Sequence, residues 1–336
     1  GGGGGGVRRT IAHVARMLTV RGGRPDLCLV HGLGTALMFP WLGRIHPGTP
    51  VAMYYHGGEV PLVRPHADAA AADAFGRVDV IFTNTEFSRR QAIERGAPPD
   101  RVHVLPVGFA LEDFDDVAPR SYRPGGRLRL LAAGRLSEEK GLRYALEALA
   151  LLVNRGIIDV QLAVAGDGYD RASLEQFVRD NGLERYVGFL GTLPADHLSR
   201  VMAQADVLLL PSVPHGNWME TQACVVQEAM LMRAIVVTTA IGGVPESIPP
   251  QMRRFMVPPG DAPAIARAIA AIRDLDPADL AALGRAGRAF VARNYDIRRL
   301  NERMLRIALR SAPGRVPGAP RSAPVTRPVT AIAADA

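Results

Sequence analysis

The sequence predicts an α/β protein with two doubly wound, parallel-sheet domains that face a cleft. Three observations support this prediction: short apolar runs alternate with segments of helical periodicity, the alternation occurs twice, and a polar stretch rich in Pro and Gly separates the two halves. Strand–helix alternation is typical of layered α/β domains with parallel sheets. A length of 336 residues also favours two domains over one.

Ten apolar runs predict buried parallel strands, four before the polar stretch and six after it. In chain order they read DLCLVHG, VAMYYHGG, VDVIFTNT, VHVLPVG, RLRLLAAG, VQLAVAGDG, VGFLG, VLLLPS, AIVVTT and FMVPPG. Segments with the period of a helix separate most of them. One such segment, 141–156, places five apolar residues on one face: Leu142, Ala145, Leu146, Leu149 and Val153.

The polar stretch at 111–127 carries no apolar period and predicts the linker between the halves. We therefore expect one Rossmann-like domain over 1–121 and a second over 125–294. A helical segment follows at 295–311, and the Pro-rich segment 312–336 predicts a disordered tail.

Composition limits the functional classes. The net charge of +7 lies mainly in the second half: residues 1–120 hold 13 arginines against 12 acidic residues, and the remainder holds 27 basic residues against 21 acidic ones. A basic half suits an anionic ligand. The surplus is too small, and an aromatic content of 6% too low, to indicate nucleic-acid binding.

The two cysteines, Cys28 and Cys224, stand far apart in apolar runs. They predict buried thiols in a reducing compartment, with no disulfide and no zinc site. No apolar stretch is long enough to span a bilayer, and no charged-then-apolar signal segment opens the chain. The location expected by default is cytoplasmic.

The first cluster of candidate functional residues contains Lys140, the only lysine in the chain. The run RLRLLAAG ends just before Arg135, and a helix is expected to start at Gly141. Two cations between a strand end and a helix N-terminus suit a diphosphate. The P-loop pattern is absent, and neither GDGYDR nor GLGTAL has the third glycine of a dinucleotide fingerprint.

The second cluster holds Glu220, expected in the loop after VLLLPS, and Glu228, expected in the helix that follows. A carboxylate on so apolar a helix needs a partner to offset its desolvation, unless it is a capping or solvated group. Eight residues of helix rise about 12 Å, roughly the span from a hexose across a diphosphate to a ribose. The helix N-terminus at 221–223 would direct free N–H groups at the diphosphate.

Seven motifs occur in order: GRLSEEKG, AGDG, VGFLG, LLLPS, the Glu220–Glu228 pair, GGVPE and VPPGD. Together they resemble the catalytic domain of glycosyltransferase family 4, the glycosyl transferases group 1, over residues 125–311. A weaker resemblance to the acceptor domain of that family lies in PDLCLVHG, VAMYYHGG and TNTEFSRRQAIERGAPPDRVHVLPVG. The resemblance implies the GT-B fold, in which an acceptor-side domain comes first, a nucleotide-sugar donor-binding domain comes second, and the helix after them crosses back to the first.

The resemblance also implies roles for individual residues. Arg135 and Lys140 match the pair that binds the diphosphate of the donor. Glu220 matches a carboxylate that contacts hydroxyls of the transferred sugar, and Glu228 matches one that binds the ribose. His56 matches a histidine that approaches the donor sugar from across the cleft, so His56 and Glu220 are the expected catalytic residues. The remaining expected donor-binding positions are Gly166, Leu190, Thr221, Gln222 and Ala223.

The activity that the resemblance implies is transfer of a sugar, with retention of anomeric configuration, from a nucleoside-diphosphate sugar to a glycan or lipid-linked acceptor in cell-surface polysaccharide or glycolipid synthesis. The cations and the helix N-terminus would stabilise charge on the departing diphosphate. No metal or other cofactor is expected, because the family typically needs none and no Asp–Mg²⁺ site is apparent. The leaving phosphate would accept the proton of the acceptor hydroxyl.

Two departures from the family pattern bear on these expectations. The chain has E-T-Q-A at 220–223 where the family often has E-G-F-G, and the loss of both glycines restricts how closely the backbone approaches a ligand. Only about 25 residues, opening with six glycines, precede PDLCLVHG, whereas the family has further strands and a glycine-rich loop there. We therefore expect a first domain that lacks its first strands.

Three alternatives stay open. The first is a truncated, non-catalytic protein that binds nucleotide-sugars. The second is a glycoside hydrolase that uses Glu220 and Glu228 as acid and nucleophile, although the Arg135–Lys140 pair speaks against it. The third is a sugar-nucleotide epimerase, although the motif spacing matches transferases. The donor base, the sugar, the acceptor and the oligomeric state stay open as well.

The segment 296–310 predicts a helix with a basic and an apolar face. The basic face carries Arg299, Arg303, Arg306 and Arg310, and the apolar face carries Leu300, Met304 and Ile307. One interpretation is a solvated face on the helix that braces the first domain. The other is peripheral attachment to an anionic membrane, where a lipid-linked acceptor would lie.

Overall fold

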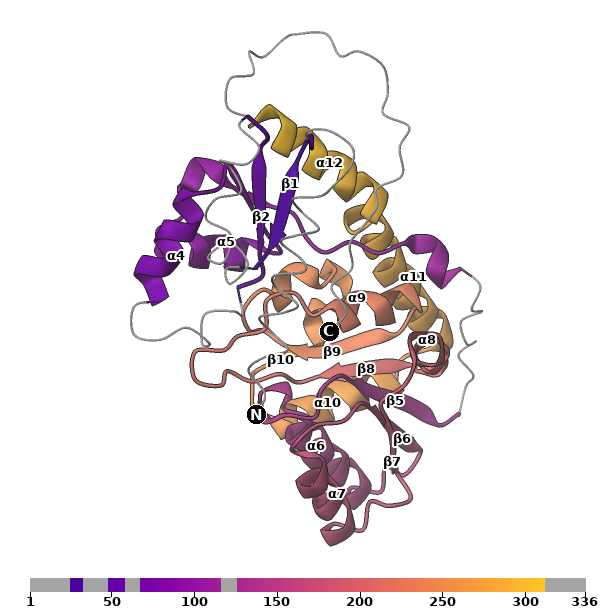
Figure 1. Cartoon of the computed structure of the whole chain (residues 1–336). Helices are drawn as coiled ribbons and strands as arrows, with labels where there is room; N and C mark the ends of the chain where they lie inside the picture. The colour runs from indigo at the N-terminus through magenta and orange to yellow at the C-terminus, as the bar shows by residue number, and fades with distance from the viewer. Residues whose placement is uncertain (1–24, 33–47, 58–66, 116–125, 312–336) are drawn as a thin grey trace.

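The structure, a computed structural model, describes residues 25–32, 48–57, 67–115 and 126–311. Within these ranges the chain forms two parallel sheets, each with helices packed against it (Figure 1). The opening glycines, the predicted domain boundary between 121 and 125 and the predicted tail at 312–336 lie outside the described residues.

The first sheet has four parallel strands in the order β1-β2-β3-β4. They are β1 (Cys28–His31), β2 (Val51–Tyr55), β3 (Val80–Thr83) and β4 (Val102–Val104). The helices in the described part of this domain are α4 (Ala67–Gly76) and α5 (Glu86–Glu94), with single 3₁₀ turns at Pro99–Arg101 and Leu111–Phe114. All four strands lie in the apolar runs that predicted them.

Side chains of this sheet alternate between its two faces, as the period of a strand requires. On one face Met53 and Tyr55 belong to the same buried cluster as residues of α4 and α5. On the other face Tyr54 packs against α12 (Ile297–Arg310), whose Leu300 is buried there. Helix α12 therefore crosses back to the first sheet (Figure 1), and its apolar face is the one that the sequence predicted.

The second sheet has six parallel strands in the order β10-β9-β8-β5-β6-β7. They are β5 (Leu128–Ala133), β6 (Val160–Ala165), β7 (Val187–Gly191), β8 (Val207–Leu210), β9 (Ile235–Thr239) and β10 (Met256–Val257). All six were predicted from apolar runs. The strand order reverses between β5 and β8, and such a switch point is where open α/β sheets bind ligands.

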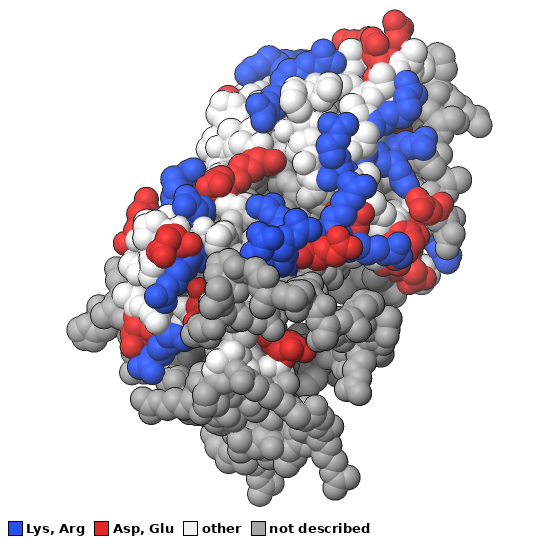
Figure 2. Space-filling view, turned by 90° about the horizontal axis from the view of Figure 1, so that it is seen from above, with Lys and Arg blue, Asp and Glu red and all other residues white. Residues whose placement is uncertain are grey.

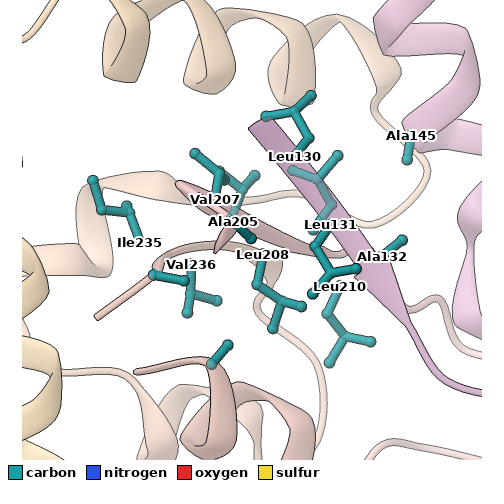
Figure 3. Close-up of a cluster of buried hydrophobic side chains, with 14 of the residues drawn as sticks. Leu130, Leu131, Ala132, Ala145, Ala205, Val207, Leu208, Leu210, Ile235 and Val236 are labelled. Atoms are coloured by element: carbon teal, nitrogen blue, oxygen red, sulfur yellow. The ribbon is translucent and has the colours of Figure 1, made fainter. Parts of the chain in front are cut away.

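Helices cover both faces of the second sheet (Figure 1). On one face lie α6 (Leu142–Asn154), α7 (Arg171–Asp180) and α10 (Ala262–Arg273), and on the other lie α8 (Ala195–Gln204), α9 (Cys224–Leu231) and α11 (Pro277–Asn294). Aliphatic side chains of β5, β8 and β9 fill the centre of the core between the layers (Figure 3). The doubly wound arrangement of this half is confirmed.

On α6, four of the five residues predicted on one face are buried, and Val153 packs half-buried against the same core. Two other local predictions need correction. Both cysteines are half-buried rather than buried, since Cys28 lies on an outer strand of the four and Cys224 is the first residue of α9. Gly141 precedes α6 in a left-handed conformation with φ 65° and is not its first residue.

The chain crosses between the domains after β4 and again after α11. At these crossings Phe109 N donates to Tyr295 O at 2.8 Å, and Ile297 N donates to Phe109 O at 3.0 Å. A Cβ on Gly108 would lie 2.7 Å from Ile297 Cα, so the two crossing segments are in close contact. The crossings therefore run side by side.

Candidate functional site

The predicted site residues follow the carboxyl ends of strands in both sheets. Arg135 comes after β5, Gly166 after β6 and Glu220 in the loop after β8, and Leu190 lies near the end of β7. Parallel strands end at a common edge, so the second sheet collects these residues along one edge. His56 follows β2 of the first sheet.

Lys140 and Glu220 form an ion pair at this edge. Lys140 Nζ lies 2.6 Å from Glu220 Oε2, and Ser212 Oγ donates to the same oxygen at 3.3 Å. The two charged side chains are 23% and 9% exposed, so the pair is largely shielded from water. The ring of Trp218 lies beside it, with its centroid 5.1 Å from Lys140 Nζ. The structure thus joins two residues that the sequence predicted for different parts of one donor.

Gly141 brings the lysine to this position. With φ at 65°, a Cβ on Gly141 would lie 2.0 Å from Pro211 O, so only glycine lets the backbone pass so close to the end of β8. Val213 N donates to Glu139 O at 2.9 Å and ties the same two segments together. The short turn that carries Lys140 is therefore fixed against the loop that carries Glu220.

Arg135 pairs with Glu139, a residue that the sequence analysis did not single out. Arg135 Nη2 lies 2.9 Å from Glu139 Oε1, and Ser137 and Tyr169 hydroxyls donate to the same carboxylate at 2.7 and 3.3 Å. Burial acts to raise the pKa of Glu139, but the bond from Ser137, its own backbone N–H and the charge of Arg135 outweigh burial, so the pKa lies below its usual value. Glu139 therefore stays ionised and orients Arg135. The run of opposite charges in RLSEEK is the signal that could have found it.

Glycines line the edge where β5 and β6 end. Gly166 has φ 137°, and a Cβ there would lie 1.8 Å from Gly134 O. A Cβ on Gly168 would lie 2.2 Å from Leu136 O. Side chains are thus excluded from this part of the edge, and Gly134 is exposed beside Arg135. Leu190 is 43% exposed, an unusual value for a large apolar side chain of this chain.

Glu228 lies on α9, and its carboxylate has no hydrogen-bond partner among the residues that the structure describes. Burial raises the pKa of its carboxyl group. Burial, and then the charges of Glu228 and Glu220, raise the pKa of the Cys224 thiol to about 11. Because α9 begins at Cys224, the 12 Å estimate, which assumed one helix from Glu220 onward, does not apply. A half-buried carboxylate without a partner is costly, and ligand hydroxyls would offset that cost.

The side chain of Gln222 reaches the first domain. Val107 N donates to Gln222 Oε1 at 2.8 Å, and Gln222 Nε2 donates to Val107 O at 3.0 Å. Both amide atoms are occupied and the residue is 8% exposed. The side chain of Gln222 therefore commits one donor and one acceptor to the backbone of the first domain.

Thr221 and Ala223, the other two residues predicted at the start of α9, differ in burial. Ala223 is buried and occupies the N-cap position without a side-chain cap. Thr221 is half-buried and faces the first domain, since a Cβ on Gly57 would lie 2.9 Å from Thr221 Cγ2. The backbone beside Glu220 thus touches the residue that follows His56.

Glu246 makes a second contact between the domains. Its carboxylate accepts the backbone N–H of Glu86 at 2.7 Å and of Phe87 at 2.9 Å, so it caps the N-terminus of α5 from the other domain. A negative charge at a helix N-terminus is favourable because of the helix dipole. The sequence analysis used Glu246 only as part of the GGVPE motif, and no local pattern announces a partner about 160 residues away.

His56 is half-buried where the first domain meets the second. Its Nδ1 lies 3.3 Å from Asn84 Nδ2. Its ring stacks on those of Tyr54 and His31, with centroids 5.5 and 5.8 Å away and interplanar angles of 13° and 16°. The ring thus contacts two aromatic neighbours, and an amide binds one of its nitrogens.

Within the described ranges, none of the helices has the length and hydropathy to cross a membrane. Those same residues contain no group of three or more His, Cys, Asp or Glu placed to hold a metal ion.

Comparison with known proteins places these features among sugar transferases. Two family models match the chain, "Glycosyl transferases group 1" over residues 127–274 and "Glycosyl transferase 4-like domain" over residues 2–108. The putative colanic acid biosynthesis glycosyltransferase WcaL of Escherichia coli K12 is 27% identical over 258 residues, which is 76% of this chain and 63% of WcaL. The 2-deoxystreptamine glucosyltransferase of Streptomyces kanamyceticus is 35% identical over 49% of this chain and 41% of its own length.

Solved structures share the arrangement of the two sheets. HepE of Anabaena, in complex with UDP and glucose, has a TM-score of 0.72 at 20% identity, covering 89% of this chain and 80% of HepE. Sucrose-phosphate synthase of Thermosynechococcus elongatus has a TM-score of 0.70 at 22% identity, covering 90% and 76%. These likenesses confirm the predicted GT-B fold. The chain spans 63% or less of the curated relatives WcaL and AmsK, so its activity is not read from theirs.

Proposed function

Because this chain belongs to the glycosyl transferases group 1, with the GT-B fold, we propose that it moves a sugar from a nucleoside-diphosphate sugar to a glycan or lipid-linked acceptor with retention of anomeric configuration. The names of WcaL and of AmsK, a glycosyltransferase of amylovoran biosynthesis in Erwinia amylovora, support a role in cell-surface polysaccharide or glycolipid synthesis. HepE was solved with UDP-glucose, which makes a UDP-sugar the first donor to test.

The Lys140–Glu220 ion pair carries this proposal. An ammonium group has three N–H donors, so Lys140 can keep Glu220 and still donate to a phosphate oxygen. Glu220 has a second carboxylate oxygen, Oε1, which has no partner among the described residues and suits sugar hydroxyls. The pair thus places a phosphate-binding cation beside a sugar-binding carboxylate at the switch point of the sheet.

The other residues at this edge extend the donor site. Arg135, held by Glu139, adds a second cation for the diphosphate. Glu228 has an unpartnered carboxylate suited to ribose hydroxyls. The glycine edge at Gly166 and the exposed Leu190 suit the flat, partly apolar surface of a base. The backbone N–H groups of Thr221 and Ala223 add donors at the start of α9.

In the proposed reaction the acceptor oxygen forms a bond to the anomeric carbon while the bond to the phosphate oxygen breaks. The electron pair of the broken bond and the proton of the acceptor hydroxyl both go to the departing diphosphate. Lys140 and Arg135 stabilise the charge that develops there, which is the main electrostatic task. Glu220 orients the sugar, and His56 faces it from the first domain. We assign no metal ion and no other cofactor to this step.

A panel of UDP-, GDP-, ADP- and TDP-sugars tests the proposal. A ligand that binds the native state raises the melting temperature, so thermal shift identifies the donor. Release of nucleoside diphosphate that depends on added acceptor, with the product anomer read by NMR, then tests transfer and retention. If no nucleotide-sugar shifts the melting temperature, the proposal fails. Binding without any release would favour the non-catalytic binding protein instead.

We also propose that α12 holds the enzyme against the anionic inner face of a membrane. Arg298 and Arg299 pair with Glu112 and Asp296 at 2.7 and 3.6 Å, but no acidic partner among the described residues holds the three later arginines, Arg303, Arg306 and Arg310. Figure 2 views the molecule from above and shows several basic side chains on this face, interspersed with acidic ones. Leu305 on the same helix is 40% exposed and could add an apolar contact to the membrane beside these arginines.

A further inference from the structure

The contact between His56 and Asn84 sits at the edge of the first sheet that meets the second domain. Tyr55 and Thr83 are register partners on the neighbouring strands β2 and β3, and His56 and Asn84 are the next residue of each. Asn84 is 6% exposed, and His56 is half-buried. Gly57, directly after His56, touches Thr221, which is next to Glu220. The pair therefore lies beside the proposed donor site.

The chemistry of the amide decides which ring nitrogen carries the proton. Asn84 Nδ2 is 3.3 Å from His56 Nδ1, and an amide NH₂ group only donates. Nδ1 must then accept with its lone pair, and a neutral imidazole with a bare Nδ1 carries its proton on Nε2. No described group bonds Nε2. The stacking of the ring on Tyr54 and His31 limits its rotation.

The oxygen of the same amide stays unsatisfied within the described ranges. Asn84 Oδ1 is buried and has no hydrogen-bond partner in the described part of the chain. A buried acceptor without a partner is uncommon in folded proteins and costs stability. The bond to His56 Nδ1 is thus the one side-chain hydrogen bond that fixes the Asn84 amide among the described residues.

We propose that Asn84 is a positioning residue that locks His56 in the Nε2–H tautomer, so that His56 offers the donor sugar or its phosphate a hydrogen-bond donor and no basic nitrogen. This inference rests on the proposed function for its substrate. It assigns a role to Asn84. It also defines what His56 contributes, which is a directed N–H whose hydrogen bond strengthens as negative charge develops on the acceptor.

The tautomer is read directly by ¹⁵N NMR of the full chain labelled at histidine, without any substrate, with the His56 signals assigned by their loss in His56→Ala. At a pH of about 9, where imidazole is neutral, the wild type should show a protonated Nε2 and an unprotonated Nδ1. Asn84→Asp places an acceptor at Nδ1 and should reverse the two signals. Asn84→Ala removes the constraint without adding charge and should give a mixture of tautomers.

Transfer kinetics complete the test at the same pH. Asn84→Asp should lower kcat on the order of 10- to 100-fold, as expected for loss of one charge-assisted donor. Asn84→Ala should lower kcat less, and it serves in place of Asn84→Asp if that variant does not fold. Asn181→Asp, the same change at the exposed end of α7, is the matched control and should leave kcat unchanged.

A protonated Nδ1 in the wild type overturns the inference, and so does a reversed tautomer in Asn84→Asp with unchanged kcat. These outcomes are separable from failure of the proposed function. If the wild type transfers no sugar, the spectra still establish or refute the tautomer that Asn84 imposes.

Discussion

Gln222 and Val107 join the two domains through a single side-chain amide. The amide oxygen accepts from Val107 N at 2.8 Å, and the amide nitrogen donates to Val107 O at 3.0 Å. Gln222 stands two residues after Glu220, so the position of the sugar-binding carboxylate is coupled to the backbone of the first domain. This contact accounts for glutamine at a position where the family pattern E-G-F-G has phenylalanine.

Gln222→Ala should weaken the contact between the two domains. Two neutral hydrogen bonds contribute about 0.5–1.5 kcal/mol each, so the free energy of unfolding should fall by a similar amount per bond, and kcat/KM should fall with it. Chemical denaturation and steady-state kinetics measure the two effects. The control is Gln176→Ala, an exposed glutamine on α7. If Gln222→Ala instead weakens binding of free nucleoside diphosphate and leaves stability unchanged, its side chain contacts the ligand, as the sequence predicted.

Lys140→Ala should weaken donor binding by about 1.5–3 kcal/mol, the loss of one charge-assisted hydrogen bond. Lys140→Arg should also weaken it, since a planar guanidinium places its charge differently between Trp218 and Glu220. Isothermal titration with nucleoside diphosphate measures both variants. Arg143→Ala, which removes an exposed cation three residues away, is the control. Wild-type affinity in the Lys140→Ala protein would rule out the phosphate role.

Glu228→Gln should stabilise the protein at neutral pH while weakening nucleotide binding. Burial raises the folded-state pKa of Glu228 above its unfolded value, so the native carboxyl holds its proton to higher pH. Its contribution to stability is therefore present below the unfolded pKa of about 4.3 and is lost as pH rises through the folded pKa. The amide stays neutral throughout, so the advantage of the variant should appear near pH 7 and vanish near pH 4.

Melting temperatures at the two pH values test this prediction. The matched control is Glu184→Gln on an exposed glutamate, which should show no such difference.

Glu220→Ala should spare binding of free nucleoside diphosphate and lose discrimination among sugars. Equal weakening of the free diphosphate by the Glu220 and Glu228 variants would contradict their separate roles.

Arg303→Glu combined with Arg306→Glu should abolish binding to anionic vesicles. Each arginine near such a surface contributes about 1 kcal/mol, and salt screens it. Co-sedimentation with vesicles rich in phosphatidylglycerol should exceed that with phosphatidylcholine and weaken as salt rises. Arg285→Glu with Arg293→Glu on α11 is the control, since both arginines are exposed on another helix. Equal recovery on both vesicle types would contradict attachment of α12 to an anionic membrane.

The sequence predicted the strands and the site edge because both depend on local patterns. Apolar runs marked all ten strands, and the ends of β5, β6 and β8 then placed Arg135, Gly166 and Glu220 on one edge. Contacts between the domains had no such signal. Gln222–Val107 and Glu246–Glu86 join residues 115 and 160 positions apart, and neither pair follows from a period, a turn or a charge pattern.

The Lys140–Glu220 pair lies between these cases. Its members were found from motifs, but their direct contact was not, because it depends on the close approach of Gly141 to Pro211. The spacing of Glu220 and Glu228 was misjudged for a related reason. A helix was assumed to run between them, whereas the backbone at 220–223 turns toward the first domain before α9 begins.

Helix α12 sets an order of events during synthesis. Ribosomes release the N-terminal half of a chain first, so β1 to β4 emerge long before residue 297. One face of that sheet, with Tyr54, Phe82 and Leu105, is covered in the finished protein by Leu300 and Ala308. Until those residues leave the ribosome, an apolar sheet surface stays uncovered, the kind of surface that chaperones bind. The first domain therefore completes its folding last, and a nascent chain stopped before α12 would depend on chaperones in a way that the full chain does not.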